Sequence, residues 1–210
     1  MYKFYINRLT MRQYGAKGYL KGILKLQSDE TYTLVTDKGS YRAWLDRDFA
    51  EYLDLTDIDI STERTFIVVP ITKEKGYANR SLGQVSYPPY LAFKIIGVDP
   101  KVKVDLDIFD IVGSCIYQAN PVISNSKLKY DPYVLISLAP YFEYKRREYT
   151  GSYKPPTIKL IGELPKDNSE GKPDAVKSNF EIKATYDGSR LIILKDNMGN
   201  YLARRLRKID

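Results

Sequence analysis

The sequence predicts an all-β protein with a minor helical part, built as two small Greek-key β-barrel modules in tandem. Three observations lead to this prediction. Apolar and polar residues alternate with the two-residue period of half-buried strands along most of the chain. Turn signals such as Asp187-Gly188 separate these runs. A set of short motifs also recurs in the same order at an offset of about 65 residues, which indicates a duplicated unit.

The first half predicts a meander of three strands. Residues 18–26 alternate between a leucine face (Leu20, Leu24 and Leu26) and a face with Tyr19, Lys21 and Lys25. Residues 31–36 and 40–45 flank Asp37-Lys38-Gly39, where the glycine can adopt the positive φ of a hairpin loop. The third strand places Tyr41, Ala43 and Leu45 opposite Arg42 and Trp44. These three strands therefore form one continuous sheet.

A short helix and two more strands complete the first module. Asp46 is a good N-cap for a helix over residues 46–53. Residues 66–71 and 90–98 are apolar runs that predict the fourth and fifth strands. This order, with a helix after the third strand, is what a five-stranded module of this size would show.

The second half repeats these patterns. Strands are predicted over residues 109–117, 133–138, 157–162, 180–186, 190–195 and 201–206, and loops over residues 141–154 and 166–178. Residues 86–101 resemble residues 152–166, and Phe109-Asp110-Ile111 resembles Phe180-Glu181-Ile182. We therefore predict one module over residues 1–103 and a second over residues 104–210.

Each module resembles a small Greek-key barrel of the OB type in its order of strands and helix. The resemblance is one of architecture and covers both halves without a signature motif. It implies that strands two and three carry a face suited to oligonucleotides. A β-sandwich, or a Tudor-like or SH3-like barrel, would show similar patterns, so these alternatives stay open.

The composition argues against acid–base and metal chemistry. The chain has no histidine, the usual general base and a common metal ligand. Cys115 is the only cysteine and lies in an apolar run, which favours a small buried side chain. Asp54, Asp57 and Asp59 lack the spacing of a calcium loop and are interpreted as an acidic loop. We predict no catalytic residues, no metal and no cofactor, while a carboxylate-based enzyme stays open.

The charge distribution suggests a polyanionic partner. The net charge is +7, and residues 1–27 hold six of the basic side chains and no acidic one. Residues 28–63 are acidic, and the last ten residues are basic again. The chain also has 19 tyrosines, more than a core needs, since a buried hydroxyl requires a partner. Exposed rings beside cations suit base stacking and phosphate contact.

We therefore predict a non-catalytic protein that binds single-stranded DNA or RNA. The rings predicted to stack on bases are Tyr19, Tyr41, Trp44, Tyr144 and Tyr149. The cations predicted to contact phosphates are Lys21, Lys25, Arg42, Lys145, Arg146, Arg147, Arg204, Arg205 and Arg207. For Trp44 the alternative is a core anchor under the helix, and for the cations it is solvated surface charge.

The competing interpretation is a structural or protein-interaction subunit of a larger assembly, with a tyrosine-rich interface. Self-association, or an assembly partner, would then replace nucleic acid. No apolar run approaches the roughly 20 residues that span a bilayer. No secretory signal is evident at the N-terminus, and no disulfide can form within the chain, so we expect a cytoplasmic protein without a membrane partner.

Overall fold

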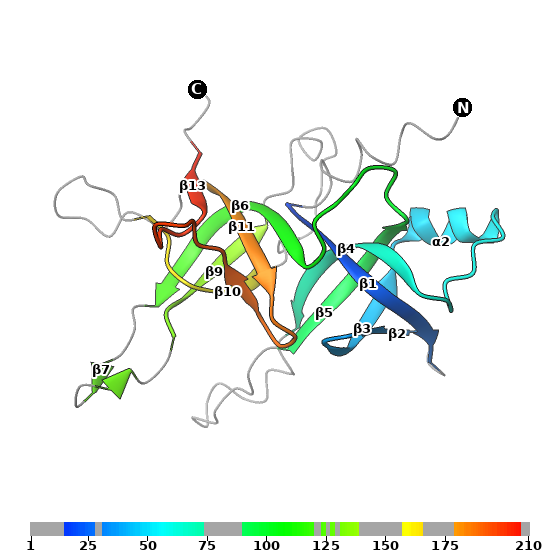
Figure 1. The fold of residues 1–210 in the computed structure, drawn as a ribbon, viewed down its shortest axis with the longest axis horizontal. Helices are drawn as coiled ribbons and strands as arrows, with labels where there is room; N and C mark the ends of the chain where they lie inside the picture. Colours follow the sequence, from blue (N-terminus) through cyan, green and yellow to red (C-terminus); the bar gives the residue numbers. More distant parts are fainter. Residues whose placement is uncertain are drawn as a thin grey trace, which may run out of the picture.

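The protein is mostly β-structure, as predicted. The computed structural model describes residues 15–27, 31–73, 90–119, 123–124, 127–128, 131–138, 157–165 and 179–206. Within these residues, strands are interrupted by one helix, α2 (Arg47–Asp54). Figure 1 shows the strands in two neighbouring bodies, with α2 at the outer end of one of them. That helix has eight residues, and no helix in the described part of the chain could cross a membrane.

The first body is a closed ring of five strands, here called the first ring. It contains β1 (Ala16–Leu26), β2 (Tyr32–Thr36), β3 (Gly39–Leu45), β4 (Arg64–Lys73) and β5 (Tyr90–Val98). The strand order is β1-β2-β3-β5-β4, and β4 pairs back onto β1 to close the ring. The β3–β5 pair is parallel and the other four pairs are antiparallel. The predicted meander of β1 to β3 is therefore confirmed.

Local sequence explains these elements. In β1, Leu20 and Leu24 point into the ring while Lys21 and Lys25 are exposed, which confirms the predicted alternation. Leu26 departs from it, because the strand ends there and the side chain is 66% exposed. The Asp46 carboxylate accepts a hydrogen bond from the Asp48 backbone N–H at 3.1 Å, which confirms the predicted cap of α2.

The second body is also a closed ring, here called the second ring. It contains β6 (Ile108–Ala119), β9 (Tyr133–Leu138), β10 (Thr157–Ile161), β11 (Asn179–Tyr186) and β12 (Leu191–Ile193). The order is β6-β9-β10-β12-β11, and β11 pairs back onto β6. Its β10–β12 pair is parallel. Outside the ring, β13 (Ala203–Arg205) pairs with β11, and β7 (Ile123–Ser124) pairs with β8 (Lys127–Leu128).

The two rings have the same topology. Position by position, β1 corresponds to β6, β2 to β9, β3 to β10, β4 to β11 and β5 to β12. The predicted sequence correspondence was wrong in its register, because it equated β5 with β10 and β6 with β11. Short apolar runs flanked by proline and glycine accompany both β5 and β10, which occupy different places in the strand order. Such a run therefore does not show which place a strand takes in its ring. The predicted boundary after residue 103 lies in the connection between Val98 and Ile108.

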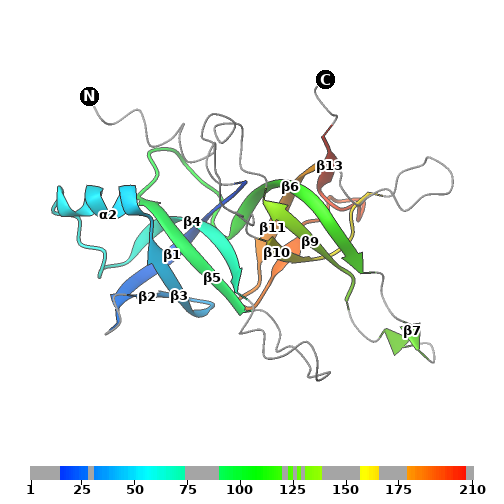
Figure 2. The same cartoon turned by 180° about the vertical axis from the view of Figure 1, so that it is seen from behind.

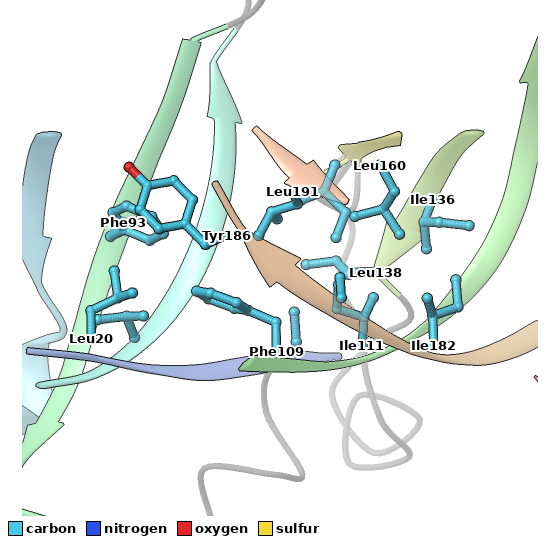
Figure 3. Packing of buried hydrophobic residues seen from close by; sticks show 14 of the residues in the cluster. Leu20, Phe93, Phe109, Ile111, Ile136, Leu138, Leu160, Ile182, Tyr186 and Leu191 are labelled. Atoms are coloured by element: carbon cyan, nitrogen blue, oxygen red, sulfur yellow. The ribbon is translucent and has the colours of Figure 1, made fainter. Parts of the chain in front are cut away.

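The rings share one core. β1 pairs with β6 through Ala16, Lys17 and Gly18, so a single sheet runs through both rings. The phenyl group of Phe93 on β5 stacks on the phenyl group of Phe109 on β6, with centroids 6.2 Å apart. Figure 3 shows these two phenyl groups and Tyr186 together, with the aliphatic core of the second ring continuing beside them. The two modules are therefore packed together, not joined only by a linker.

Polar contacts surround this shared core at the junction. The Tyr41 hydroxyl lies 2.6 Å from the Gly188 carbonyl oxygen and 2.9 Å from the Lys38 carbonyl oxygen. The Tyr186 hydroxyl lies 3.0 Å from the same Gly188 oxygen. Burial, followed by the neighbouring Tyr41 hydroxyl, strongly raises the pKa of Tyr186. The turn between β2 and β3 and the turn between β11 and β12 therefore meet at this point, as Figure 2 shows from behind.

Candidate functional site

The outer surface of β1, β2 and β3 gathers several of the predicted binding residues. Side chains of directly paired residues project to the same side of a sheet. Lys25 on β1 pairs with Thr33 on β2, and Thr33 pairs with Arg42 on β3. Lys25 and Arg42 are exposed, and Thr33 between them is partly buried. We call Lys25, Thr33, Arg42 and Trp44 the first face.

Trp44 lies on the first face and not in the core. Its indole is partly buried, and the Arg42 guanidinium lies over it at 5.5 Å from the ring centroid. Among the described residues, the hydrophobic core includes Phe49 of α2 but not Trp44. The alternative prediction for Trp44 was a core anchor under the helix. Phe49 has this role instead, because its phenyl ring is buried in the core.

An ion pair borders the first face. Trp44 pairs in the parallel register with Lys94 on β5. The Lys94 ammonium lies 2.5 Å from the Asp46 carboxylate, and that carboxylate also caps α2. The acidic start of the helix therefore neutralises one lysine beside Trp44, while Lys25 and Arg42 lie further along the face.

Two of the predicted cations are held by carboxylates. Lys21 on β1 lies 2.6 Å from Glu63, and Arg204 on β13 lies 2.5 Å from Glu181 on β11. Arg205 is exposed on β13, an added strand of the second ring. The structure therefore does not bring Arg204 and Arg205 to the first face.

Two predicted stacking tyrosines lie away from the first face. Tyr41 projects toward the junction, where its ring packs edge-on against Phe93 and Tyr186 at 5.6 and 5.2 Å. The stacking role predicted for Tyr41 does not fit this placement, because its hydroxyl contacts backbone carbonyl oxygens and its ring packs against two other aromatic side chains of the protein. Tyr19 lies on the part of β1 that pairs with β4, with the Lys17 ammonium over its ring at 5.1 Å.

The remaining predicted residues are Tyr144, Lys145, Arg146, Arg147, Tyr149 and Arg207. They lie outside the described residues. Their predicted contacts with bases and phosphates stay predictions.

Three further aromatic and basic residues gather on the corresponding strands of the second ring. Tyr117 on β6 and Tyr133 on β9 have ring centroids 5.9 Å apart, and the Lys159 ammonium lies over the Tyr133 ring at 4.1 Å. Burial, followed by the nearby Tyr117, raises the pKa of Tyr133. These residues fall outside the predicted binding set, because residues 133–136 form a continuous apolar run without an alternation that would mark Tyr133 as outward.

Cys115 and Asp59, two side chains of the described residues that could take part in chemistry, have structural roles. Cys115 is fully buried on β6, as its apolar surroundings predict, and burial raises the pKa of its thiol. The Asp59 carboxylate accepts hydrogen bonds from the Ser61 backbone N–H at 2.8 Å and its hydroxyl at 2.6 Å. Those hydrogen bonds lower the pKa of Asp59. The chemistry offered by the first face is stacking and charge contact.

The chain matches no protein-family model and no curated protein sequence.

Proposed function

We propose that the protein binds single-stranded nucleic acid on the first face and that both rings are barrels of the OB type. The support for the fold is the shared strand order with its one parallel pair, and the helix after the third strand of the first ring. In OB barrels the face of strands two and three is a common site for oligonucleotides. We assign no catalytic step to this function.

The observation that carries the proposal is the Arg42 guanidinium over the Trp44 indole, with Lys25 across β2 on the same face. An aromatic ring that stacks on a base contributes about 1–3 kcal/mol and accepts any base. Neighbouring strands lie about 4.8 Å apart, so the backbones at Lys25 and Arg42 are separated by roughly 10 Å. Two cations at this separation can contact different phosphates of one strand that passes over Trp44.

Trp44 is the only tryptophan of the chain, so its fluorescence reports on the first face. Titration with oligodeoxythymidylate at low salt should change the emission of Trp44 in a saturable way. Lys25 and Arg42 alone would contribute about −1.4 to the slope of log affinity against log salt, and five phosphate contacts would give about −3.5. Unchanged emission together with no retention of the oligonucleotide at low salt would refute the proposal. Parallel titrations with oligouridylate would distinguish DNA from RNA.

The alternative proposal is a subunit of a larger assembly. Its support is the high tyrosine content and the exposed apolar side chains Leu26, Leu55, Val102 and Met198. These four lie on separate segments, and apolar side chains scattered singly are common on monomers. A defined oligomer in light scattering, with no response to nucleic acid, would favour this alternative.

We also propose a cytoplasmic location. The support is that a chain with a single cysteine cannot form an internal disulfide, which is typical of proteins in oxidising compartments.

A further inference from the structure

The matching topology identifies the residue of the second ring that corresponds to Arg42. In the first ring, the parallel pairing of the third and fifth strands begins with Ala43 opposite Phe93. In the second ring it begins with Leu160 opposite Leu191. Ala43 and Leu160 are both fully buried, and each is preceded by an outward cation. Arg42 and Lys159 therefore occupy the same position in the two rings.

The antiparallel register extends this correspondence across the sheet. Arg42 pairs with Thr33 and Thr33 with Lys25, whereas Lys159 pairs with Leu135 and Leu135 with Tyr117. Tyr117 thus takes the position of Lys25. Across its three strands, the first ring has a cation, a polar residue and a second cation at these paired positions. The second ring has an aromatic residue, an apolar residue and a cation. We call Tyr117, Leu135, Lys159 and Tyr133 the second face.

The second face has an accessible aromatic surface next to a positive charge. The side chain of Tyr117 is 49% exposed, and its ring is tilted by 45° from the ring of Tyr133. The Lys159 ammonium lies over the other ring, Tyr133, at 4.1 Å. The exposed ring offers a stacking surface, and the lysine provides a contact for a phosphate beside it.

We propose that the second ring binds single-stranded nucleic acid on the second face, with Tyr117 stacking on a base and Lys159 contacting a phosphate. This inference rests on the proposed function for the class of ligand, but it adds a second site on different residues. Each protein chain would then bind two short oligonucleotides, or one longer oligonucleotide that reaches both faces. The two sites differ in character, because the second has more aromatic surface and fewer cations.

Counting bound strands tests this inference. The probe is oligodeoxythymidylate of about six nucleotides, within the ~4–16 nucleotides that one OB barrel covers. Isothermal titration at low salt should give two strands per wild-type chain. The double variant Tyr117→Ala/Lys159→Met should bind one strand, with its other site at least about tenfold weaker. Its Trp44 emission should respond as in the wild type, because Trp44 lies in the other ring.

Two further variants separate the faces. Lys25→Met/Arg42→Met should also bind one strand, and its remaining binding should leave Trp44 emission unchanged. Lys183→Met is the matched control, because Lys183 is an exposed lysine on β11 that pairs with Asp110 outside both faces. This control should still bind two strands.

The outcomes distinguish the two proposals. One strand per wild-type chain, with the Trp44 response intact and no effect of Tyr117→Ala/Lys159→Met, would refute the second face and leave the proposed function standing. Binding that depends only on Tyr117 and Lys159, with no Trp44 response, would refute the first face and support the second. No binding of any strand at low salt would refute both.

Discussion

The Lys38 ammonium lies 2.6 Å from the Asp107 carboxylate, and this contact joins the β2–β3 turn to the segment that leads into the second ring. Lys38 also donates a hydrogen bond to the Tyr186 carbonyl at 2.9 Å. The side chains of the ion pair are 29% and 26% exposed, so solvent screens them less than a surface pair. The junction is therefore held by charge as well as by its aromatic core.

Removing the charge of Lys38 should weaken the docking of the rings. Lys38→Met is expected to lower the free energy of unfolding by about 1–3 kcal/mol, because a partly buried carboxylate and a carbonyl lose their donor. Urea denaturation measures this change. Lys183→Met is the control, since Lys183 and Asp110 are 3.3 Å apart and more than half exposed, and it should change stability by less than about 1 kcal/mol. Equal effects of the two variants would contradict the assigned role of Lys38.

The shared core predicts that the two rings unfold together. Phe109→Ala removes a fully buried ring that stacks on Phe93, and we expect a loss of about 3–5 kcal/mol. The emission of Trp44 reports on the first ring, although the substitution lies in the second. Its denaturation midpoint should fall together with the midpoint from far-ultraviolet circular dichroism. A Trp44 transition that stays at the wild-type midpoint would show that the rings are independent.

Arg42→Met should weaken binding and reduce its salt dependence. Loss of one phosphate contact is expected to make the slope of log affinity against log salt less negative by about 0.7. Arg204→Met is the matched control, because Arg204 is paired with Glu181 on the added strand β13. This control should leave both affinity and slope close to those of the wild type. If Arg204→Met has the larger effect, the nucleic acid binds near β13 and not on the first face.

Acid should loosen the turn between β11 and β12. Burial opposes ionisation of Asp187, but hydrogen bonds from the backbone N–H groups of Ser189 and Arg190 and from both side chains prevail and hold its pKa at about 2. The ordinary pKa is 3.8, so the folded state has the lower value. Its stabilising effect is complete above that ordinary value and is lost as the pH falls toward about 2. Denaturation at several acidic pH values should show a flatter dependence for Asp187→Asn, and an unchanged dependence would contradict this assignment.

Strands and turns could be predicted from the sequence because their signals are local. Residues 90–98 and 133–138 form strands with the predicted bounds, and Asp46 caps the helix as expected. Gly39 and Gly188 adopt the positive φ that their turns require. Two-residue alternation decides which side of a strand is buried, so Leu20, Leu24 and Ala43 were placed correctly.

The pairing of distant strands could not be predicted in the same way. Register between β1 and β4, or between β1 and β6, depends on packing across the barrel and is not encoded in neighbouring residues. Alternation puts Tyr41 on the same side of β3 as Ala43, yet the sequence predicts that Tyr41 stacks on bases, because it does not show that the second ring covers this side. The second face was missed for the related reason that its strands β6, β9 and β10 are far apart in the sequence, whereas β1, β2 and β3 follow one another closely.

The pairing of β1 with β2, β4 and β6 bears on how the chain could be divided. Residues 101–103 are exposed and include two lysines, so a protease could cut the backbone there. The two pieces would stay bound through the sheet and the Phe93–Phe109 contact. Expressed alone, each piece would uncover an aromatic surface that its companion normally shields. Coexpression of both pieces, each without a solubility tag, is then the natural route to a split form of this protein.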